Sequence, residues 1–372
     1  MKKLIFSLFI SSSLMAQQPA ANLTNRIDSI IKEYNQNGPG CAVAIVKDGK
    51  MIYSKGYGLA SLDYDIPITP ATVFDIASVS KQFAAYAVSE LVQQKKISLK
   101  DDIRKYIPEV PQFGKTITID HLVHHTSGLR DWTETLAVAG WRGEEVYSMA
   151  DIMRMLKRQQ DLDFPPGTKY QYSNTGYNLL AVLVERVTGK PFTTWTKENI
   201  FMPLGMQSTQ FLENHRRVIK NMAYAYYPVN DSFAKANSQL TALGSSSMFT
   251  SVDDFSKWMI HLLQALREQK PEFKRMLQTG VLDNGEKITY AFGLAVNQYK
   301  GLSHVSHTGS WAGYRSVSNY YPEQNLGVVV LSNTASFTRD KADKVADLFL
   351  KDHFSPQQAS ATQGLINSSD PT

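Results

Sequence analysis

Ser78-Val79-Ser80-Lys81 stands at the beginning of an apolar segment whose pattern is helical. The apolar residues after it recur at the three- and four-residue spacing of one helix face: Phe83, Ala84, Ala87, Val88, Leu91 and Val92. Residues three apart share a helix face, so the lysine amine can reach the serine hydroxyl. A hydroxyl becomes a good nucleophile when a base takes its proton, and a lysine can be that base if burial lowers its pKa. The segment therefore predicts a buried helix that begins at Ser78 and carries a nucleophile and its base.

The same Ser-x-x-Lys spacing occurs twice more, at Ser29–Lys32 and at Ser232–Lys235. Ser29 lies in an ordinary amphipathic pattern near the N-terminus, and Ser232 lies in a polar stretch without periodicity. Taken alone, a serine and a lysine at this spacing are usually a helix cap and a surface lysine. The interpretation of Ser78 as a nucleophile therefore depends on the other motifs of the chain.

The segment Tyr172-Ser173-Asn174 precedes a long apolar helical pattern, Tyr177 to Val187, which Gly189 ends. Tyr172 supplies a second titratable group, and the amide of Asn174 supplies both a donor and an acceptor. A tyrosine in such a place, considered alone, would be a buried aromatic residue whose hydroxyl finds a partner. The position just before a buried helix makes both side chains candidates for a site.

His307-Thr308-Gly309-Ser310 lies at the end of a strand-like segment, and a second strand pair follows at Val317–Tyr321 and Leu326–Leu331. Gly309 has no side chain, so a substrate backbone could lie close along this strand. His307 alone would more often be a strand histidine with its hydrogen bonds satisfied within the fold. The segment predicts one wall of a substrate cleft.

In this order, Ser-x-x-Lys, Tyr-x-Asn and a (Lys/His)-Thr-Gly strand resemble the active site of the class C β-lactamases. The same set occurs in the related serine peptidases and esterases of the penicillin-binding superfamily. The resemblance runs from about Gly38 to about Phe349. It implies catalytic roles for three residues: Ser78 as nucleophile, Lys81 as general base and Tyr172. It also implies substrate-binding roles for Asn174, His307, Thr308, Gly309 and Ser310.

The resemblance further implies an oxyanion hole formed by the backbone N–H groups of Ser78 and Ser310. It implies no cofactor and no metal ion. His121, His124 and His125 could suggest a metal site, but neither an HExxH motif nor a cysteine pair accompanies them. A helix-and-turn role is the favoured interpretation of these histidines.

One departure from the family pattern concerns the substrate. Class C β-lactamases carry lysine where this chain has His307, and a lysine offers a permanent positive charge to a substrate carboxylate. Histidine is mostly neutral at pH 7 unless a partner raises its pKa, although Arg315 could restore a charge nearby. Histidine here resembles the aminopeptidase and esterase branches of the superfamily. The expected substrate is therefore a D-amino-acid peptide, a cell-wall-related molecule or a small ester.

Two alternatives stay open at this point. The first is a true β-lactamase. The second is a catalytically weak protein that binds cell-wall fragments, which the presence of Ser78, Lys81 and Tyr172 together disfavours. Whether Lys81 or Tyr172 is the general base is undecided, and so is the oligomeric state.

The first sixteen residues have the pattern of a secretory signal peptide. Lys2 and Lys3 precede an apolar core, Leu4 to Ile10, and small residues lead to Ala16. No later apolar run approaches the roughly 20 residues that a membrane span needs. We expect cleavage near Ala16, a periplasmic or secreted protein, and no membrane span after the signal is removed.

Composition restricts the class of partner. The 372 residues are 43% hydrophobic and 20% charged, which is ordinary for a soluble globular protein. The formal charge of +5 includes Lys2 and Lys3, and this bias is too small to indicate nucleic acid. The expected partner is a small molecule or a peptide. The sole cysteine, Cys41, lies in an apolar run and reads as a small core residue.

The coarse pattern predicts a mixed α/β (α+β) fold of the β-lactamase/transpeptidase type. A helix at 23–34 precedes a hairpin, Cys41–Val46 and Met51–Tyr57, and residues 81–266 are mostly helical. Further strands are expected at 288–296 and 304–308, and a final helix at 338–349. Strands at both ends predict one central antiparallel sheet flanked by helices, with the helical region packed beside it. The catalytic domain is expected to span residues 17–354, and residues 355–372 to be a disordered tail.

Overall fold

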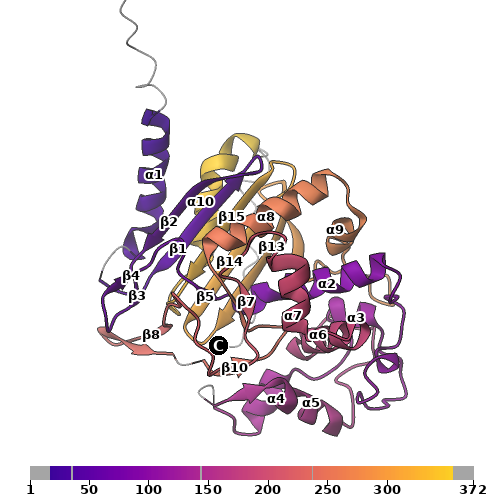
Figure 1. Ribbon diagram of the computed structural model, residues 1–372. Helices are drawn as coiled ribbons and strands as arrows, with labels where there is room; N and C mark the ends of the chain where they lie inside the picture. The colour runs from indigo at the N-terminus through magenta and orange to yellow at the C-terminus, as the bar shows by residue number, and fades with distance from the viewer. Residues whose placement is uncertain (1–16, 35–36, 143–144, 237, 355–372) are drawn as a thin grey trace, which may run out of the picture.

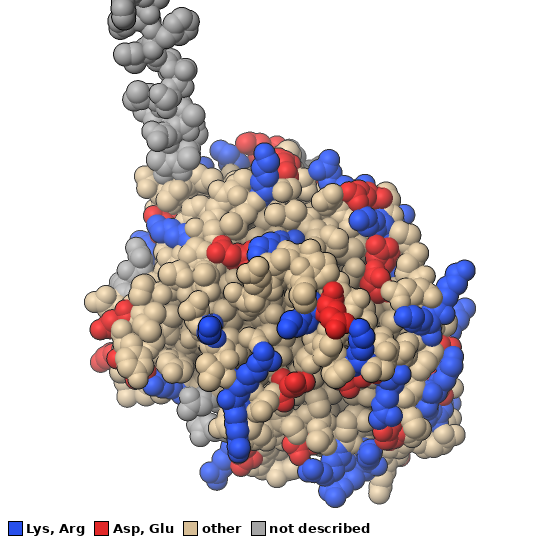
Figure 2. All heavy atoms as spheres, in the orientation of Figure 1, with Lys and Arg blue, Asp and Glu red and all other residues tan. Residues whose placement is uncertain are grey.

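The computed structural model describes residues 17–34, 37–142, 145–236 and 238–354. The predicted signal peptide (1–16) and tail (355–372) lie outside these residues. Among the described residues, no helix combines the length and the apolar character that crossing a bilayer would require. On the face shown in Figure 2, basic and acidic side chains are interspersed.

A six-stranded antiparallel sheet joins the two ends of the chain, as predicted. Its strands, in spatial order, are β12 (Ala295–Tyr299), β13 (Leu302–Trp311), β14 (Tyr314–Tyr321), β15 (Leu326–Ser332), β1 (Cys41–Lys47) and β2 (Lys50–Tyr57). The N-terminal hairpin adds to the C-terminal strands through β1 and β15, where Cys41 lies opposite Ser332 and Lys47 opposite Leu326. The predicted mixed fold with a central antiparallel sheet is confirmed.

Both faces of this sheet are buried, which explains why β1 and β15 are almost continuously apolar. Cys41, Val43 and Ile45 face α1 (Gln17–Ile31) and α10 (Asp340–Leu350). The alternate residues Ala42, Ala44 and Val46 face the opposite core, which α8 (Val252–Arg267) covers. Figure 1 shows α1 and α10 on one side of the sheet and α8 on the other. Cys41 is a buried core residue, as predicted.

The rest of the chain packs beside the sheet and consists mainly of helices. They are α2 (Lys81–Gln93), α3 (Ile119–Val123), α4 (Trp132–Val138), α5 (Met149–Arg158), α6 (Asn174–Thr188), α7 (Phe192–Thr196) and α9 (Pro271–Met276). Short helical turns occur at Lys32–Tyr34, Ala77–Ser80, Ile103–Lys105, Lys197–Phe201 and Lys351–His353. The buried helix α6 packs against α2 and α3, and Gly189 ends it in the left-handed conformation.

Several short strands lie within the region that the sequence predicts as helical, residues 81–266, or just before it. One small sheet contains β5 (Phe74–Asp75), β11 (Met248–Thr250) and β7 (Gln210–Phe211). Three two-stranded pairs are β3 (Leu59–Ser61) with β4 (Ile66–Pro67), β6 (Tyr147–Ser148) with β10 (Leu240–Thr241), and β8 (Tyr226–Val229) with β9 (Ser232–Lys235). Segments of two to four residues are too short to display the alternation by which a strand is recognised.

Two further expectations are wrong in detail. The α-helix begins at Lys81 and not at Ser78, because Ala77–Ser80 forms a 3-10 turn before it. The expected strand at 288–296 is mostly irregular, and the regular strand starts at Ala295. Gly293 is the reason, since it has φ +69° and a Cβ there would lie 2.6 Å from the backbone at the start of α2. The chain bends around α2 at this glycine.

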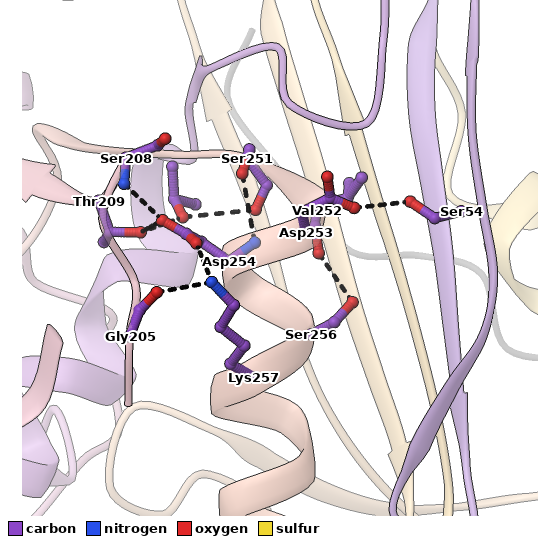
Figure 3. A network of polar contacts seen from close by, with 11 residues as sticks. Ser54, Gly205, Ser208, Thr209, Ser251, Val252, Asp253, Asp254, Ser256 and Lys257 are labelled. Atoms are coloured by element: carbon purple, nitrogen blue, oxygen red, sulfur yellow. Dashed lines mark hydrogen bonds and ion pairs between the residues drawn. The ribbon is translucent and has the colours of Figure 1, made fainter. Parts of the chain in front are cut away.

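The beginning of α8 is held by a network of polar contacts (Figure 3). Ser251 caps the helix by accepting a hydrogen bond from the Asp254 N–H. The buried carboxylate of Asp254 accepts from the Ser208 N–H at 2.7 Å and the Thr209 hydroxyl at 3.0 Å. It also pairs with Lys257 at 2.7 Å. Asp254 therefore ties the helix that covers the sheet to the loop before β7.

Asp254→Ala is expected to destabilise the protein by about 1–3 kcal/mol, because it removes the shared acceptor of the Ser208 N–H and the buried Thr209 hydroxyl together with the ion pair to Lys257. Asp253→Ala is a matched control in the same helical turn. Asp253 accepts a single hydrogen bond, from the Ser54 hydroxyl at 2.9 Å, and its loss should cost about 0.5–1 kcal/mol. Urea unfolding measures both values, and equal losses would show that Asp254 contributes only as a helix-terminal charge.

Candidate active site

Lys81 lies at the centre of the candidate site and is fully buried. Its ammonium or amine nitrogen contacts three oxygen atoms. They are the Ser78 hydroxyl at 3.1 Å, the Asn174 side-chain oxygen at 2.7 Å and the Ser245 carbonyl at 2.9 Å. The first two motifs therefore meet in one place, since Lys81 is the first residue of α2 and Asn174 the first of α6.

The 3-10 turn Ala77–Ser80 explains how Ser78 reaches Lys81. With three residues per turn, positions i and i+3 lie directly above one another. The turn follows a sharp bend at Ala77, which has φ +45°. Asp75 supports the bend, because its buried carboxyl accepts a hydrogen bond from the Ala77 N–H at 2.8 Å. The bend presents the partly exposed Ser78 at the surface while Lys81 stays beneath it.

Burial lowers the pKa of Lys81 from its ordinary value of 10.5 to about 7, and the nearby Asp131 carboxylate opposes this shift. Asp131 is itself buried. It caps α4 by accepting from the Thr133 N–H, and it also accepts from the Asn174 N–H. A large fraction of Lys81 is therefore a neutral amine near pH 7, within hydrogen-bond distance of a hydroxyl.

Tyr172 is close to both Lys81 and Ser78. Its ring centroid lies 4.8 Å from the Lys81 nitrogen. Burial raises the pKa of Tyr172 well above 10, and a hydrogen bond with the Ser78 hydroxyl opposes this rise in part. The phenol therefore keeps its proton at neutral pH, and Ser78 is flanked by a neutral amine and a protonated phenol.

His307 lies within the third motif, and both of its ring nitrogens are engaged inside the protein. Nδ1 is 2.6 Å from the Thr308 carbonyl and Nε2 is 2.9 Å from the Tyr290 hydroxyl. Because a carbonyl only accepts, Nδ1 carries the proton and Nε2 accepts from Tyr290. Burial lowers the pKa of His307 to about 3, so the ring is neutral. In this arrangement the only ring N–H of His307 is bonded to the Thr308 carbonyl and is not free to donate to a substrate.

Gly309 has a different role from the one expected. A Cβ at this position would lie 2.3 Å from the Ile76 carbonyl and 2.2 Å from the Ser316 hydroxyl. The missing side chain therefore lets β13 approach the segment just before Ser78, and protein atoms fill the space that a side chain would take. Thr308 and Ser310 alternate with the buried His307 and Gly309 and are exposed.

Arg315 does not replace the missing charge at His307. Its Nη1 atom donates to the carbonyls of Ala312 at 3.0 Å and Tyr314 at 2.8 Å, in the turn between β13 and β14. The half-buried side chain thus stabilises its own turn.

The sequence patterns did not assign four residues to the site that the structure places there: Asp131, Ser245, His125 and Tyr290. His125 lies in the His-Thr-Ser-Gly segment after α3, and its ring packs against those of Tyr172 at 4.3 Å and Tyr290 at 4.4 Å. That segment was a signal for His125. Ser245 contributes a backbone carbonyl and Tyr290 contributes through tertiary packing, so a local sequence pattern cannot predict either of them.

The other two histidines have structural roles in α3, as predicted. The Thr118 hydroxyl and the His121 ring accept reciprocal backbone hydrogen bonds at the helix N-terminus. The His124 ring contacts the Asp120 and Gln278 carbonyls at 3.1 and 3.0 Å. Within the described ranges, no group of three or more His, Cys, Asp or Glu side chains is placed to hold a metal ion.

The family model described as Beta-lactamase matches residues 27–351. This match covers most of the chain, so the protein belongs to the Beta-lactamase family. Protein flp of Staphylococcus aureus (strain MRSA252) is 29% identical over 84% of this chain and 63% of its own length. A D-aminopeptidase of Gluconobacter oxydans (strain 621H) is 26% identical over 87% of this chain and 61% of its own. The chain therefore spans less than two thirds of these relatives.

Solved structures agree with this assignment. The octameric penicillin-binding protein homologue from Pyrococcus abyssi has a TM-score of 0.77 at 26% identity, over 89% of this chain and 77% of that one. The D-amino acid amidase of Ochrobactrum anthropi SV3 has a TM-score of 0.74 at 21% identity, over 89% and 99%. The second likeness concerns the fold alone.

Proposed function

We propose that this protein is a serine hydrolase that cleaves an amide or an ester through an acyl-enzyme on Ser78. One observation carries the proposal: the fully buried Lys81, whose pKa is lowered to about 7, lies 3.1 Å from the Ser78 hydroxyl. A neutral amine at this distance is the arrangement that activates a serine nucleophile.

In the proposed first step, the Ser78 oxygen attacks the substrate carbonyl carbon while its proton passes to the Lys81 amine. The carbonyl electrons move to the oxygen, and the backbone N–H groups of Ser78 and Ser310 are the proposed donors to that oxyanion. When the carbonyl re-forms, the bond to the leaving nitrogen or oxygen breaks. The leaving group takes a proton from the Lys81 ammonium through the Tyr172 phenol. Water then attacks the acyl carbonyl carbon while Lys81 takes its proton. The bond from that carbon to the Ser78 oxygen breaks, and the Ser78 oxygen takes the proton back from the Lys81 ammonium.

Lys81 is the better candidate for the base. A base must be unprotonated at working pH, and the pKa directions of the two residues differ in this respect. The pKa of Lys81 falls to about 7, whereas that of Tyr172 rises well above 10. Tyr172 then serves as a proton donor and relay. Asn174 binds Lys81 through its side-chain oxygen, which leaves its amide NH₂ for a substrate carbonyl.

For the substrate we propose a D-amino-acid peptide, a cell-wall-related molecule or a small ester. The neutral, internally bonded His307 supports this class, because it supplies no fixed charge for a β-lactam carboxylate. The D-aminopeptidase relative points in the same direction. Export to the periplasm or exterior, with cleavage near Ala16, is part of the proposal and is checked by N-terminal sequencing of the secreted protein.

A substrate panel tests this proposal: nitrocefin, a D-alanine anilide, an acyl-D-Ala-D-Ala peptide and a short-chain nitrophenyl ester. We expect the ester or a D-amino-acid substrate to be turned over fastest. His307→Lys should raise the ratio of nitrocefin to ester turnover about tenfold or more, because it adds a charged hydrogen bond to the β-lactam carboxylate, worth about 1.5–3 kcal/mol, that the internally bonded His307 does not make. His307→Gln, which adds no charge, is the control.

Nitrocefin turnover by the wild type far above every other substrate would show that the protein is a β-lactamase. Binding of a cell-wall peptide without any turnover would favour the binding-protein alternative.

A further inference from the structure

His125 is a buried residue that lies outside the three sequence motifs of the candidate site. It follows α3 and is only 1% exposed. Its φ of +58° places it in the left-handed region, which few residues other than glycine adopt. This conformation turns the chain after α3 toward the irregular segment that carries Tyr172.

Three contacts from His125 enclose Tyr172. The His125 carbonyl accepts a hydrogen bond from the Gln171 N–H at 2.9 Å. Its ring Nδ1 accepts from the Ser173 N–H at 3.0 Å. The same ring packs on the Tyr172 ring, with centroids 4.3 Å apart and planes inclined by 36°. One residue therefore bonds the N–H groups of the residues before and after Tyr172 and packs on a face of its phenol.

The ring of His125 acts as an acceptor in a fixed tautomer. Because Nδ1 accepts from a peptide N–H, the neutral ring carries its proton on Nε2. Burial holds the pKa of His125 well below 6.5, and the charge on Lys81 and the His307 ring add to this. Protonation would replace the acceptor with a donor facing the Ser173 N–H, so neutrality preserves the contact.

We propose that His125 is the positioning residue for Tyr172, holding the phenol against Ser78 by bonding the peptide groups on both sides of it. The inference rests on the proposed function, which gives Tyr172 its catalytic role. Tyr172 lies in a segment without regular secondary structure, where no helix or strand ladder fixes the backbone. His125 supplies the missing constraint, and a displacement of about 1 Å at such a group can cost roughly a hundredfold in rate.

The test measures the rate at which an alkyl fluorophosphonate labels Ser78. His125→Phe keeps a ring on Tyr172 but removes the acceptor for Ser173, and labelling should slow by about 10–100-fold. His125→Asn keeps an acceptor close to the place of Nδ1 and tolerates a positive φ, so it should restore much of the rate. His124→Asn is the matched control, because His124 is buried beside it and does not contact Tyr172. His124→Asn should lower the melting temperature but leave the rate of Ser78 labelling close to that of the wild type.

A double variant separates positioning from general damage. If His125 acts through Tyr172, then His125→Phe combined with Tyr172→Phe should label no more slowly than Tyr172→Phe alone. If the losses in labelling rate of the two single variants multiply in the double variant, the proposal is wrong. It is also wrong if His125→Phe is labelled at the wild-type rate while Tyr172→Phe is labelled slowly. If His125→Phe does not fold, His125→Gln takes its place, since its longer side chain carries the acceptor away from Ser173. Labelling that survives Ser78→Ala, or wild-type labelling by Tyr172→Phe, would overturn the proposed function and this inference with it.

Discussion

Ser78→Ala is expected to lower ester and amide turnover by about 10⁴-fold or more, because removing the nucleophile of an acyl-enzyme mechanism leaves only the binding and oxyanion contributions. The fold should be unaffected, since Ser78 is partly exposed and its hydroxyl contacts only the groups of the site. Steady-state kinetics on the best substrate of the panel measures the loss, and thermal unfolding checks the fold.

Ser232→Ala is the matched control for this variant. Ser232 has the same spacing to a lysine, Lys235, but both lie on the exposed strand β9. The turnover of Ser232→Ala should equal that of the wild type. A Ser78→Ala enzyme that kept more than a few per cent of wild-type turnover would show that another residue is the nucleophile.

Lys81→Arg is expected to have the second largest effect. Arginine keeps a positive charge near Asn174 and Ser245 but does not deprotonate at neutral pH. Acylation should therefore fall by about 10²–10⁴-fold, the range for loss of a general base. Lys81→Met, which removes the charge as well, should be equally slow. An Arg variant with near wild-type acylation would make Lys81 an electrostatic residue.

The pH dependence follows from the same lysine. Lys81 accepts the Ser78 proton only as a neutral amine, and its pKa is lowered to about 7. The wild-type acylation rate should therefore rise about tenfold per pH unit below pH 7 and level off above it. Lys81→Arg should lack this limb. A wild-type rate that is flat or falls between pH 6 and pH 8 would contradict the role of Lys81 as base.

The parts of the fold that could be predicted from sequence are those with long periodic signals. The apolar runs at Cys41–Val46 and Leu326–Leu331 predicted buried strands, and β1 and β15 pair at the centre of the sheet. The short strands and the 3-10 turn at Ala77–Ser80 could not be predicted in this way. The short strands arise from tertiary pairing, such as that of β5 with β11, and the turn depends on the hydrogen bond that the Asp75 carboxyl accepts from the Ala77 N–H.

In the candidate site, too, local patterns could be predicted from the sequence and tertiary contacts could not. Ser78, Lys81, Tyr172 and Asn174 were found by spacing, because the residues of each motif are close in the sequence and each motif lies at the start of a buried helix. Their meeting through Lys81 is a property of the packing between α2 and α6. The roles of Gly309 and His307 could not be inferred, because they depend on Ile76 and Tyr290, which lie far away in the sequence.

Identification of the residue that forms the covalent bond tests the central claim most directly. The protein is treated with an alkyl fluorophosphonate, its intact mass is measured, and the modified peptide is mapped after trypsin digestion. We predict one adduct per chain, on the peptide of residues 56–81 and at Ser78 within it. We also predict no adduct in Ser78→Ala and a slow one in Lys81→Arg. An adduct on any other residue, or one that persists in Ser78→Ala, would contradict the assignment of Ser78 as the nucleophile.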